Sequence, residues 1–148
     1  MDENKVRIET LLHAPVGEVW KAWTDPDTVL KWFGSDPEGS GLKARIDLRV
    51  GGQYEISFQN ADQTQFTCLG EYSEVEEFHK LAFNWMWENE PGVISQVTVL
   101  LTPDGKATRM HFEHRDLGTA SAHDYAPGWQ RTFEKLRRML LTPVAGNT

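Results

Sequence analysis

Alternation of apolar and polar residues is the most regular pattern in this 148-residue chain. The stretch Val6–Leu12 alternates first and predicts a strand with every second side chain on one side. Alternation resumes at Leu42 and continues to His114, interrupted by turn signals such as Gly51-Gly52. The pattern therefore predicts one early strand and then about six consecutive ones, at residues 42–48, 54–58, 66–75, 81–87, 97–101 and 110–114.

Details of the middle strands lead to three further expectations. The alternation slips between Tyr72 and Val75, which predicts a β-bulge in that strand. The segment Leu81–Trp87 alternates most regularly and lacks proline and glycine, so we expect it at the centre of the sheet. Leu42, Ala44, Ile46 and Leu48 alternate with charged residues, which predicts a strand with these four side chains on one side.

Two short helices are predicted directly after the first strand. Pro15 suits the first turn of a helix, and the apolar residues that follow lie on one helical face: Val16, Val19, Trp20 and Trp23. Asp25 and Pro26 form a second helix start, because aspartate caps the free N–H groups and proline fits the first position. This second helix turns Leu30 and Phe33 inward and ends at Gly34.

The C-terminal segment predicts a helix of about fifteen residues, with an apolar face formed by Trp129, Phe133, Leu136 and Leu140. Pro127 and Gly128 would bend any helix that extends further upstream. This apolar face is the only long one available to cover the sheet. The sequence therefore predicts an α+β fold: a curved antiparallel sheet of about seven strands wrapped around a long C-terminal helix, with two short helices after the first strand.

Composition limits the class of protein. The length predicts a single domain, residues 1–148, with its core at about residues 5–141. The net charge of −7 argues against nucleic acid and membrane surfaces as partners, because phosphate binding needs a basic face. No apolar run approaches the roughly 20 residues of a membrane-spanning helix. The lone Cys68 cannot form an internal disulfide, so we expect a reducing, cytoplasmic location.

Short strings along most of the chain resemble one protein family: residues 14–15 with 19–26, 31–34, 47–52, 70–72 with Val75, 81–85 and 128–129. Their order over roughly residues 5–141 resembles the family of the activator of heat-shock-protein-90 ATPase homologue, in the START-like (SRPBCC, helix-grip) superfamily. The resemblance implies a helix-grip fold with a cavity between sheet and long helix that holds apolar ligands. Lipid carriers, polyketide cyclase/aromatase-like enzymes and co-chaperone domains all occur in this superfamily.

Ten residues of the predicted inner face are candidates for the walls of a ligand cavity, because large flat side chains leave gaps against a curved sheet. They are Tyr54, Phe58, Phe83, Trp85, Trp87, Met110, Phe112, His114, Trp129 and Phe133. An ordinary packed core is the alternative interpretation of each. Likewise, a buried histidine such as His114 is more often structural, but it could orient the polar end of a ligand or act as a general base. The Tyr54 hydroxyl could also fix that polar end.

The sequence predicts no metal and no cofactor. His111 and His114 fall on opposite faces of one strand, and His13 and His79 are isolated. The glycine-rich loops that bind phosphates and dinucleotides do not occur, nor does a serine nucleophile elbow. We expect Cys68 to be a small buried apolar side chain rather than a nucleophile.

Three classes of function stay open. The leading one is a binding module for a small apolar or aromatic molecule. The second is a polyketide cyclase/aromatase-like enzyme that uses the same cavity, less favoured because no catalytic constellation is evident. The third is a stress-related interaction with a chaperone, which would need an exposed patch; acidic residues around Glu74 and the Trp32–Phe33 pair are the candidates. A homodimer also stays open.

Overall fold

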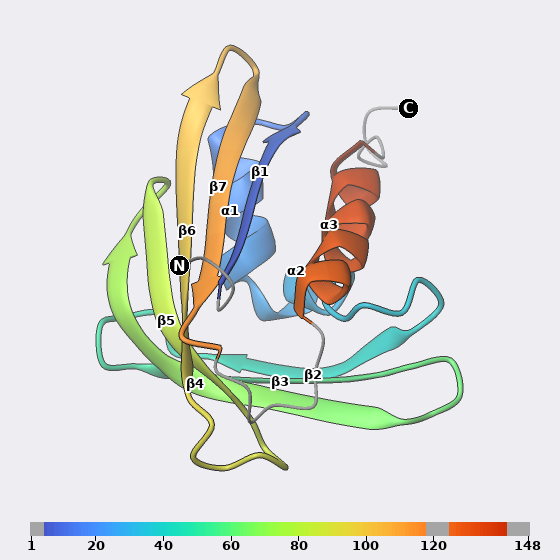
Figure 1. Ribbon diagram of the computed structural model, residues 1–148. Helices are drawn as coiled ribbons and strands as arrows, with labels where there is room; N and C mark the ends of the chain where they lie inside the picture. The colour runs from blue at the N-terminus through green and yellow to red at the C-terminus, as the bar shows by residue number, and fades with distance from the viewer. Residues whose placement is uncertain (1–4, 118–124, 142–148) are drawn as a thin grey trace.

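The computed structural model describes residues 5–117 and 125–141, and a strongly curved antiparallel sheet dominates it (Figure 1). Its strands stand in the order β1-β7-β6-β5-β4-β3-β2, so the first strand pairs with the last. Their bounds are β1 Val6–Leu12, β2 Ser40–Ile46, β3 Gln53–Gln59, β4 Gln65–Glu76, β5 Lys80–Trp87, β6 Ser95–Asp104 and β7 Ala107–Arg115.

Three helices lie against the hollow of the sheet: α1 Val16–Thr24, α2 Pro26–Val29 and α3 Tyr125–Leu141. Figure 1 shows that α3 begins near β2 and β3 and runs alongside β1 toward the other end of the molecule. Of its predicted apolar face, Trp129, Phe133 and Leu136 are buried, and Leu140 is partly buried against the same core. The arrangement confirms the predicted α+β helix-grip fold.

The pairing around β5 confirms two predictions about the sheet. β5 is the fourth of the seven strands and therefore lies at the centre. The register between β4 and β5 shifts between Tyr72 and Glu74, where the bulge was expected. Such a shift interrupts the regular ladder of backbone hydrogen bonds and bends the strand.

Just before this shift, the pairing of β4 with β5 passes over Gly70 and Glu71, and side-chain hydrogen bonds join the strands there. The side-chain Oδ1 of Asn84 accepts a hydrogen bond from the backbone N–H of Glu71 at 2.9 Å. The Tyr54 hydroxyl donates to the backbone oxygen of Asn84 at 2.8 Å. Gly70 makes room for both, because a Cβ there would lie 2.1 Å from that oxygen. The hydroxyl of Tyr54 is therefore engaged by the sheet itself, and burial raises its pKa.

Leu42 and Leu48 depart from the alternation predicted for residues 42–48, whereas Ala44 and Ile46 pack against the core. Leu42 is 42% exposed and Leu48 is 36% exposed. The pairing of β2 with β3 shifts between Gly41 and Lys43, and such a shift changes which face a side chain occupies. Leu48 lies beyond the end of β2, where strand alternation no longer determines its direction.

The segment after α2 corrects two further predictions. α2 ends at Val29 rather than at Gly34; beyond it, the N–H groups of Lys31 and Trp32 bond to carbonyls three residues back, which tightens the turn. Trp32 and Phe33 are both buried, so the expected exposed pair is wrong. The indole N–H of Trp32 donates to the backbone oxygen of Ala22 at 2.8 Å, which fixes this segment against α1.

The bend predicted near Pro127 concerns residues upstream of Tyr125, which lie outside the described residues. α3 begins at Tyr125, so Pro127 occupies its first turn. Backbone N–H groups there have no partner within the helix, and proline costs no helical hydrogen bond at this position.

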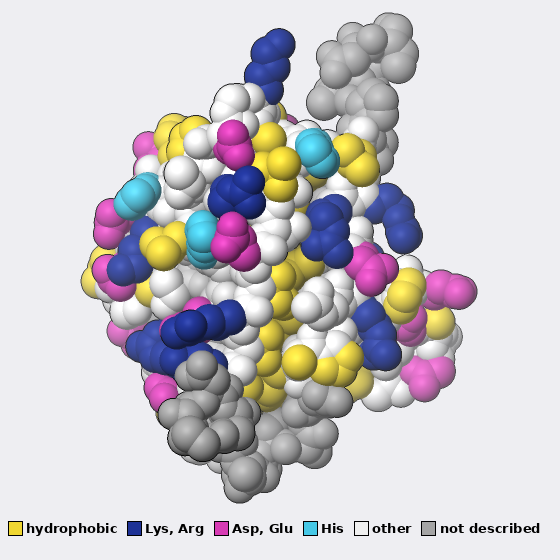
Figure 2. Space-filling view, turned by 45° about the horizontal axis from the view of Figure 1, so that its top comes forward, with side chains coloured by type: hydrophobic (Ala, Val, Ile, Leu, Met, Phe, Trp, Pro, Cys, Tyr) yellow, Lys and Arg dark blue, Asp and Glu magenta, His cyan; other side chains and the backbone are white. Residues whose placement is uncertain are grey.

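Aromatic rings fill the space between the sheet and the helices. Trp23 of α1 is their centre: its ring lies 4.9 Å from that of Trp32, 6.1 Å from Phe133 and 6.3 Å from Phe112, centroid to centroid. Figure 2 shows a band of hydrophobic side chains on the displayed face, with charged side chains of both signs on either side. The ring contacts around Trp23 show that the core is closely packed between α1, α3 and the sheet.

Candidate functional site

A pocket of about 280 Å³ lies where α3 begins, between its first turns and the ends of β3, β4 and β5. Its walls are mainly aromatic: Phe33, Phe58, Phe66, Trp85, Trp87, Tyr125 and Trp129. Gly34, Pro127 and Gly128 complete them, and four polar side chains also line the pocket: Ser35, Asn60, Arg131 and Thr132. The space thus combines an apolar interior with a few polar groups, as is typical of ligand sites.

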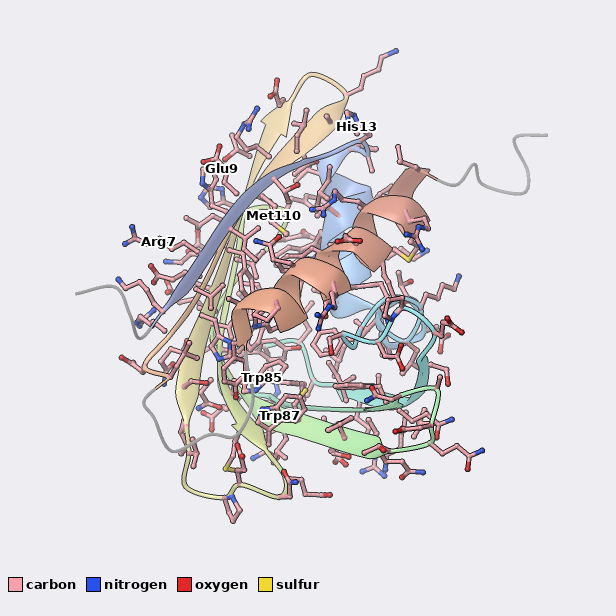
Figure 3. All side chains as sticks on the ribbon, turned by 45° about the vertical axis from the view of Figure 1, so that its right-hand side comes forward. Arg7, Glu9, His13, Trp85, Trp87 and Met110 are labelled. Atoms are coloured by element: carbon pink, nitrogen blue, oxygen red, sulfur yellow. The ribbon has the colours of Figure 1, made fainter. Side chains whose placement is uncertain are left out.

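Strand alternation explains most of the aromatic wall. Trp85 and Trp87 are two residues apart on β5 and point to the same face (Figure 3). Phe58 of β3 and Phe66 of β4 are direct cross-strand partners, and their rings stack at 5.7 Å. The Trp87 ring contacts both phenylalanines at 6.0 Å. These four rings form one continuous side of the pocket.

The opposite side comes from the segment after α2 and from α3. Gly34 has a φ of +107°, a conformation that favours glycine, and a Cβ there would lie 2.8 Å from the Phe58 ring. Glycine therefore lets the chain pass close over the sheet and places Phe33 beside the pocket. The ring of Phe33 stacks on Trp85 at 5.9 Å and meets Trp129 edge to face at the same distance.

A hydrogen-bonded chain behind the pocket fixes Trp129. Its indole N–H donates to Nδ1 of the buried His114 at 2.9 Å. Nδ1 must then be the unprotonated nitrogen, so Nε2 carries the hydrogen and donates to the Ser95 hydroxyl at 2.6 Å. Burial lowers the pKa of His114 to about 3, which keeps the ring neutral.

His114 therefore acts as a positioning group in this structure rather than as a base. Both ring nitrogens are engaged by side chains of the core, and the residue is fully buried. The predicted inward direction of the side chain is confirmed. Its predicted alternative role as a general base has no support in this geometry, because no nitrogen is left to accept a proton from a ligand.

The other tryptophan N–H groups differ in their partners. Trp87 Nε1 donates to the Tyr125 hydroxyl at 2.7 Å, which joins β5 to the first turn of α3. Trp85 Nε1 is buried and has no hydrogen-bond partner in the structure. The ring centroids of Trp87 and Trp129 lie 5.2 and 5.3 Å from that of Trp85, so the surroundings of Trp85 are chiefly aromatic.

Four of the ten residues predicted as cavity walls line this pocket: Phe58, Trp85, Trp87 and Trp129. The other six lie elsewhere in the core. Tyr54 and Phe83 border a crevice of about 10 Å³ beside Trp23, hardly room for one water molecule. Met110, Phe112, His114 and Phe133 are buried beyond the pocket, and Figure 3 shows Met110 well apart from Trp85 and Trp87.

Sequence reasoning missed several residues of the pocket. Phe66 alternates with Cys68 on its strand, and Tyr125 lies four residues before Trp129 on one helical face, so both could have been found by spacing. Asn60, Ser35 and Arg131 had no such signal. They are brought to the pocket by the turn after β3, the loop after α2 and the exact start of α3.

The described part of the chain contains no group of three or more His, Cys, Asp or Glu side chains that could hold a metal ion. Cys68 is fully buried, and burial raises the pKa of its thiol. Within the same residues, no helix is both long and apolar enough to cross a membrane.

The fold and the pocket at its helix define a START-like, helix-grip protein. Residues 13–140 match the family described as Activator of Hsp90 ATPase homolog 1-like protein, and the chain therefore belongs to this family. No match is found among curated proteins.

Solved structures show the same fold. A protein from Chromobacterium violaceum is 22% identical, covering 95% of this chain and 99% of its own, with a TM-score of 0.82. The AHSA1 protein from Silicibacter pomeroyi is 21% identical, covering 92% and 96%, with a TM-score of 0.79. DynU16, a protein of the dynemicin biosynthetic locus, is 26% identical over 95% of this chain but only 48% of its own, with a TM-score of 0.75.

Proposed function

We propose that the chain binds a small, flat, apolar or aromatic molecule in the pocket at the start of α3. The observation that carries this proposal is the wall of aromatic rings around a space of about 280 Å³, at one end of an otherwise packed core. Ligand pockets usually measure about 300–1,000 Å³, so this one suits a molecule of one or two rings. Burial of the ligand's apolar surface would supply most of the affinity.

The rigidity of the wall supports the same proposal. Trp129 is fixed by His114, and Trp87 is tied to Tyr125, so two of the largest rings hold their places through hydrogen bonds. Rings that are already ordered lose little conformational freedom when a ligand arrives, which favours binding.

Binding accounts for these residues better than catalysis does. The pocket walls contain no Asp, Glu, His or Cys among the described residues, so an acid–base pair for a polyketide cyclase/aromatase-like reaction has no obvious source. DynU16 belongs to a biosynthetic locus, but it is a longer protein of which this chain covers about half.

A stress-related interaction with a chaperone, homodimer formation and a cytoplasmic location stay predictions. Trp32 and Phe33 are buried, so this pair cannot form part of an exposed surface that binds a chaperone. The acidic residues around Glu74 remain, although Glu74 itself pairs with Lys80 at 2.9 Å.

A pocket-filling substitution tests the proposal. Gly128 lines the pocket, and a Cβ there would meet only the Ser35 side chain, at 3.9 Å. Gly128→Leu should therefore occupy the space without strain and, because leucine favours helix over glycine, without loss of stability. Calorimetric titration with naphthamide, a neutral two-ring probe, should show one site in the unmodified chain and at least about tenfold weaker binding in Gly128→Leu.

Gln130→Leu is the matched control, since Gln130 is exposed on the same helix and does not line the pocket. It should bind naphthamide like the unmodified chain. Equal binding by the unmodified chain and Gly128→Leu would mean that the probe sits elsewhere, and no saturable binding at all would refute the proposal.

A further inference from the structure

The pocket walls carry a single formal charge among the described residues, the guanidinium of Arg131. The remaining lining residues are aromatic, small or neutral polar ones, and none is a carboxylate. The chain as a whole has a net charge of −7. The pocket therefore differs in sign from the protein that surrounds it, and a general excess of basic residues does not explain the cation.

Arg131 also forms no ion pair within the described residues. It is exposed, and no carboxylate of the described residues lies within ion-pair distance of it. Other arginines of the fold are paired: Arg7, Arg49 and Arg109 each contact a carboxylate at 2.9–3.2 Å. One turn further along α3, Lys135 donates to the backbone oxygen of Asp36 at 3.0 Å and is already engaged.

The surroundings of Arg131 add to the preference for negative charge. The pocket includes the first turn of α3, and the aligned peptide dipoles make the beginning of a helix positive. Ser35 and Asn60 are the other polar side chains at this end that can donate hydrogen bonds. The nearest carboxylate on the same segment, Asp36, accepts hydrogen bonds from the N–H groups of Ala61 and Glu38, which lower its pKa and occupy its oxygens.

We propose that the molecule bound in this pocket is an aromatic carboxylate. The inference rests on the proposed function and adds the chemical class of the ligand. Its rings lie against Trp85, Trp87 and Trp129, and its carboxylate lies at the rim, beside Arg131. The planar guanidinium presents paired N–H donors that match the two oxygens of a carboxylate.

The contribution of the charge is modest, because Arg131 is exposed to water and salt. An exposed ion pair strengthens binding by a few fold, and we expect the carboxylate to bind about three- to tenfold more tightly than an uncharged molecule of the same shape. The difference should shrink as ionic strength rises, since salt screens exposed charges.

Naphthoate and naphthamide test this directly, because they share the ring system and differ in charge. Calorimetric titrations at low salt should show the three- to tenfold preference for naphthoate in the unmodified chain. Arg131→Gln should remove the preference by weakening naphthoate alone and leave the affinity for naphthamide unchanged. Lys106→Gln is the control: it changes the net charge equally, but Lys106 is exposed in the turn between β6 and β7 and does not line the pocket.

The outcomes separate the two proposals. Equal affinities of the unmodified chain for both probes, or a preference that survives in Arg131→Gln, would overturn the assignment of ligand class while naphthamide binding still supports the pocket. A preference lost equally in Lys106→Gln would also overturn it, because net charge rather than Arg131 would then be the cause. If neither probe binds, the proposed function fails and this inference fails with it.

Discussion

His114 shows how one buried polar residue can determine the shape of an apolar site. It accepts a hydrogen bond from Trp129 and, through its other nitrogen, reaches Ser95 on the neighbouring strand. A buried polar group without partners would cost free energy of folding, and here each nitrogen has one. The histidine therefore ties the helix to the sheet beside the pocket while staying out of contact with the ligand space.

The lowered pKa of His114 predicts an acid-sensitive stability. Its folded pKa of about 3 lies below the ordinary value of 6.5, so between these values the unfolded chain binds more protons than the folded one. The free energy of unfolding should therefore fall as the pH falls through this window, by up to about 1.4 kcal/mol per pH unit from this residue. Urea denaturation between about pH 7 and about pH 5 measures it.

His114→Gln is the matched variant, because its side-chain amide can accept from Trp129 and donate to Ser95 but does not titrate in this range. Its stability should change much less over the same interval. Asp25, Asp36 and Asp62, whose pKa values are lowered by hydrogen bonds, lose stability only in stronger acid and affect both proteins alike. Parallel pH profiles of the two proteins would show that His114 is not held neutral.

Two glycines should respond in opposite directions to the same substitution. Gly70→Ala places a Cβ 2.1 Å from the backbone oxygen of Asn84, and we expect a loss of about 2–3 kcal/mol, as in overpacked cores. Gly128→Ala has room and lies within a helix, so it should gain about 0.5–1 kcal/mol. Denaturant unfolding of both variants checks this. A tolerated Gly70→Ala would argue against the side-chain bridge between β4 and β5.

At the scale of elements, the position of β5 at the centre of the sheet predicts where the fold is most stable. β5 pairs with β4 on one side and β6 on the other, and its inward residues are buried. Its amide hydrogens should therefore exchange among the slowest in the protein, whereas those of the edge strand β2 should exchange quickly. Hydrogen exchange followed by NMR measures both. Faster exchange in β5 than in β2 would contradict the observed strand order.

Strands were predicted correctly from the sequence where the local alternation of apolar and polar residues alone determines them. Strict alternation located β5, and its slip after Tyr72 located the bulge, because both depend only on a period of two residues. It failed at Leu42, whose direction depends on a register shift against β3, and at Trp32, which is drawn inward by a hydrogen bond to Ala22. Contacts between distant segments decide both positions, and no local pattern contains them.

At the scale of the whole molecule, the same limit applies to the pocket. Alternation correctly assigned an inner face to the aromatic residues, but it could not divide that face into packed core and pocket wall. Phe112 is covered by Trp23 and Phe133, whereas Trp87 borders the pocket, although both side chains point to the inner face of the sheet. Which inner-face residues are packed and which line the pocket depends on where α3 lies relative to the curved end of the sheet (Figure 1).

The six tryptophans allow the central claim to be tested within one sample. Trp85, Trp87 and Trp129 line the pocket, and the other three, Trp20, Trp23 and Trp32, do not. Titration of the ¹⁵N-labelled chain with naphthamide, followed through the six assigned indole N–H signals, should shift the first three and leave the second three nearly unchanged. Equal shifts in both groups, or shifts confined to Trp20, Trp23 and Trp32, would contradict a ligand site at the start of α3.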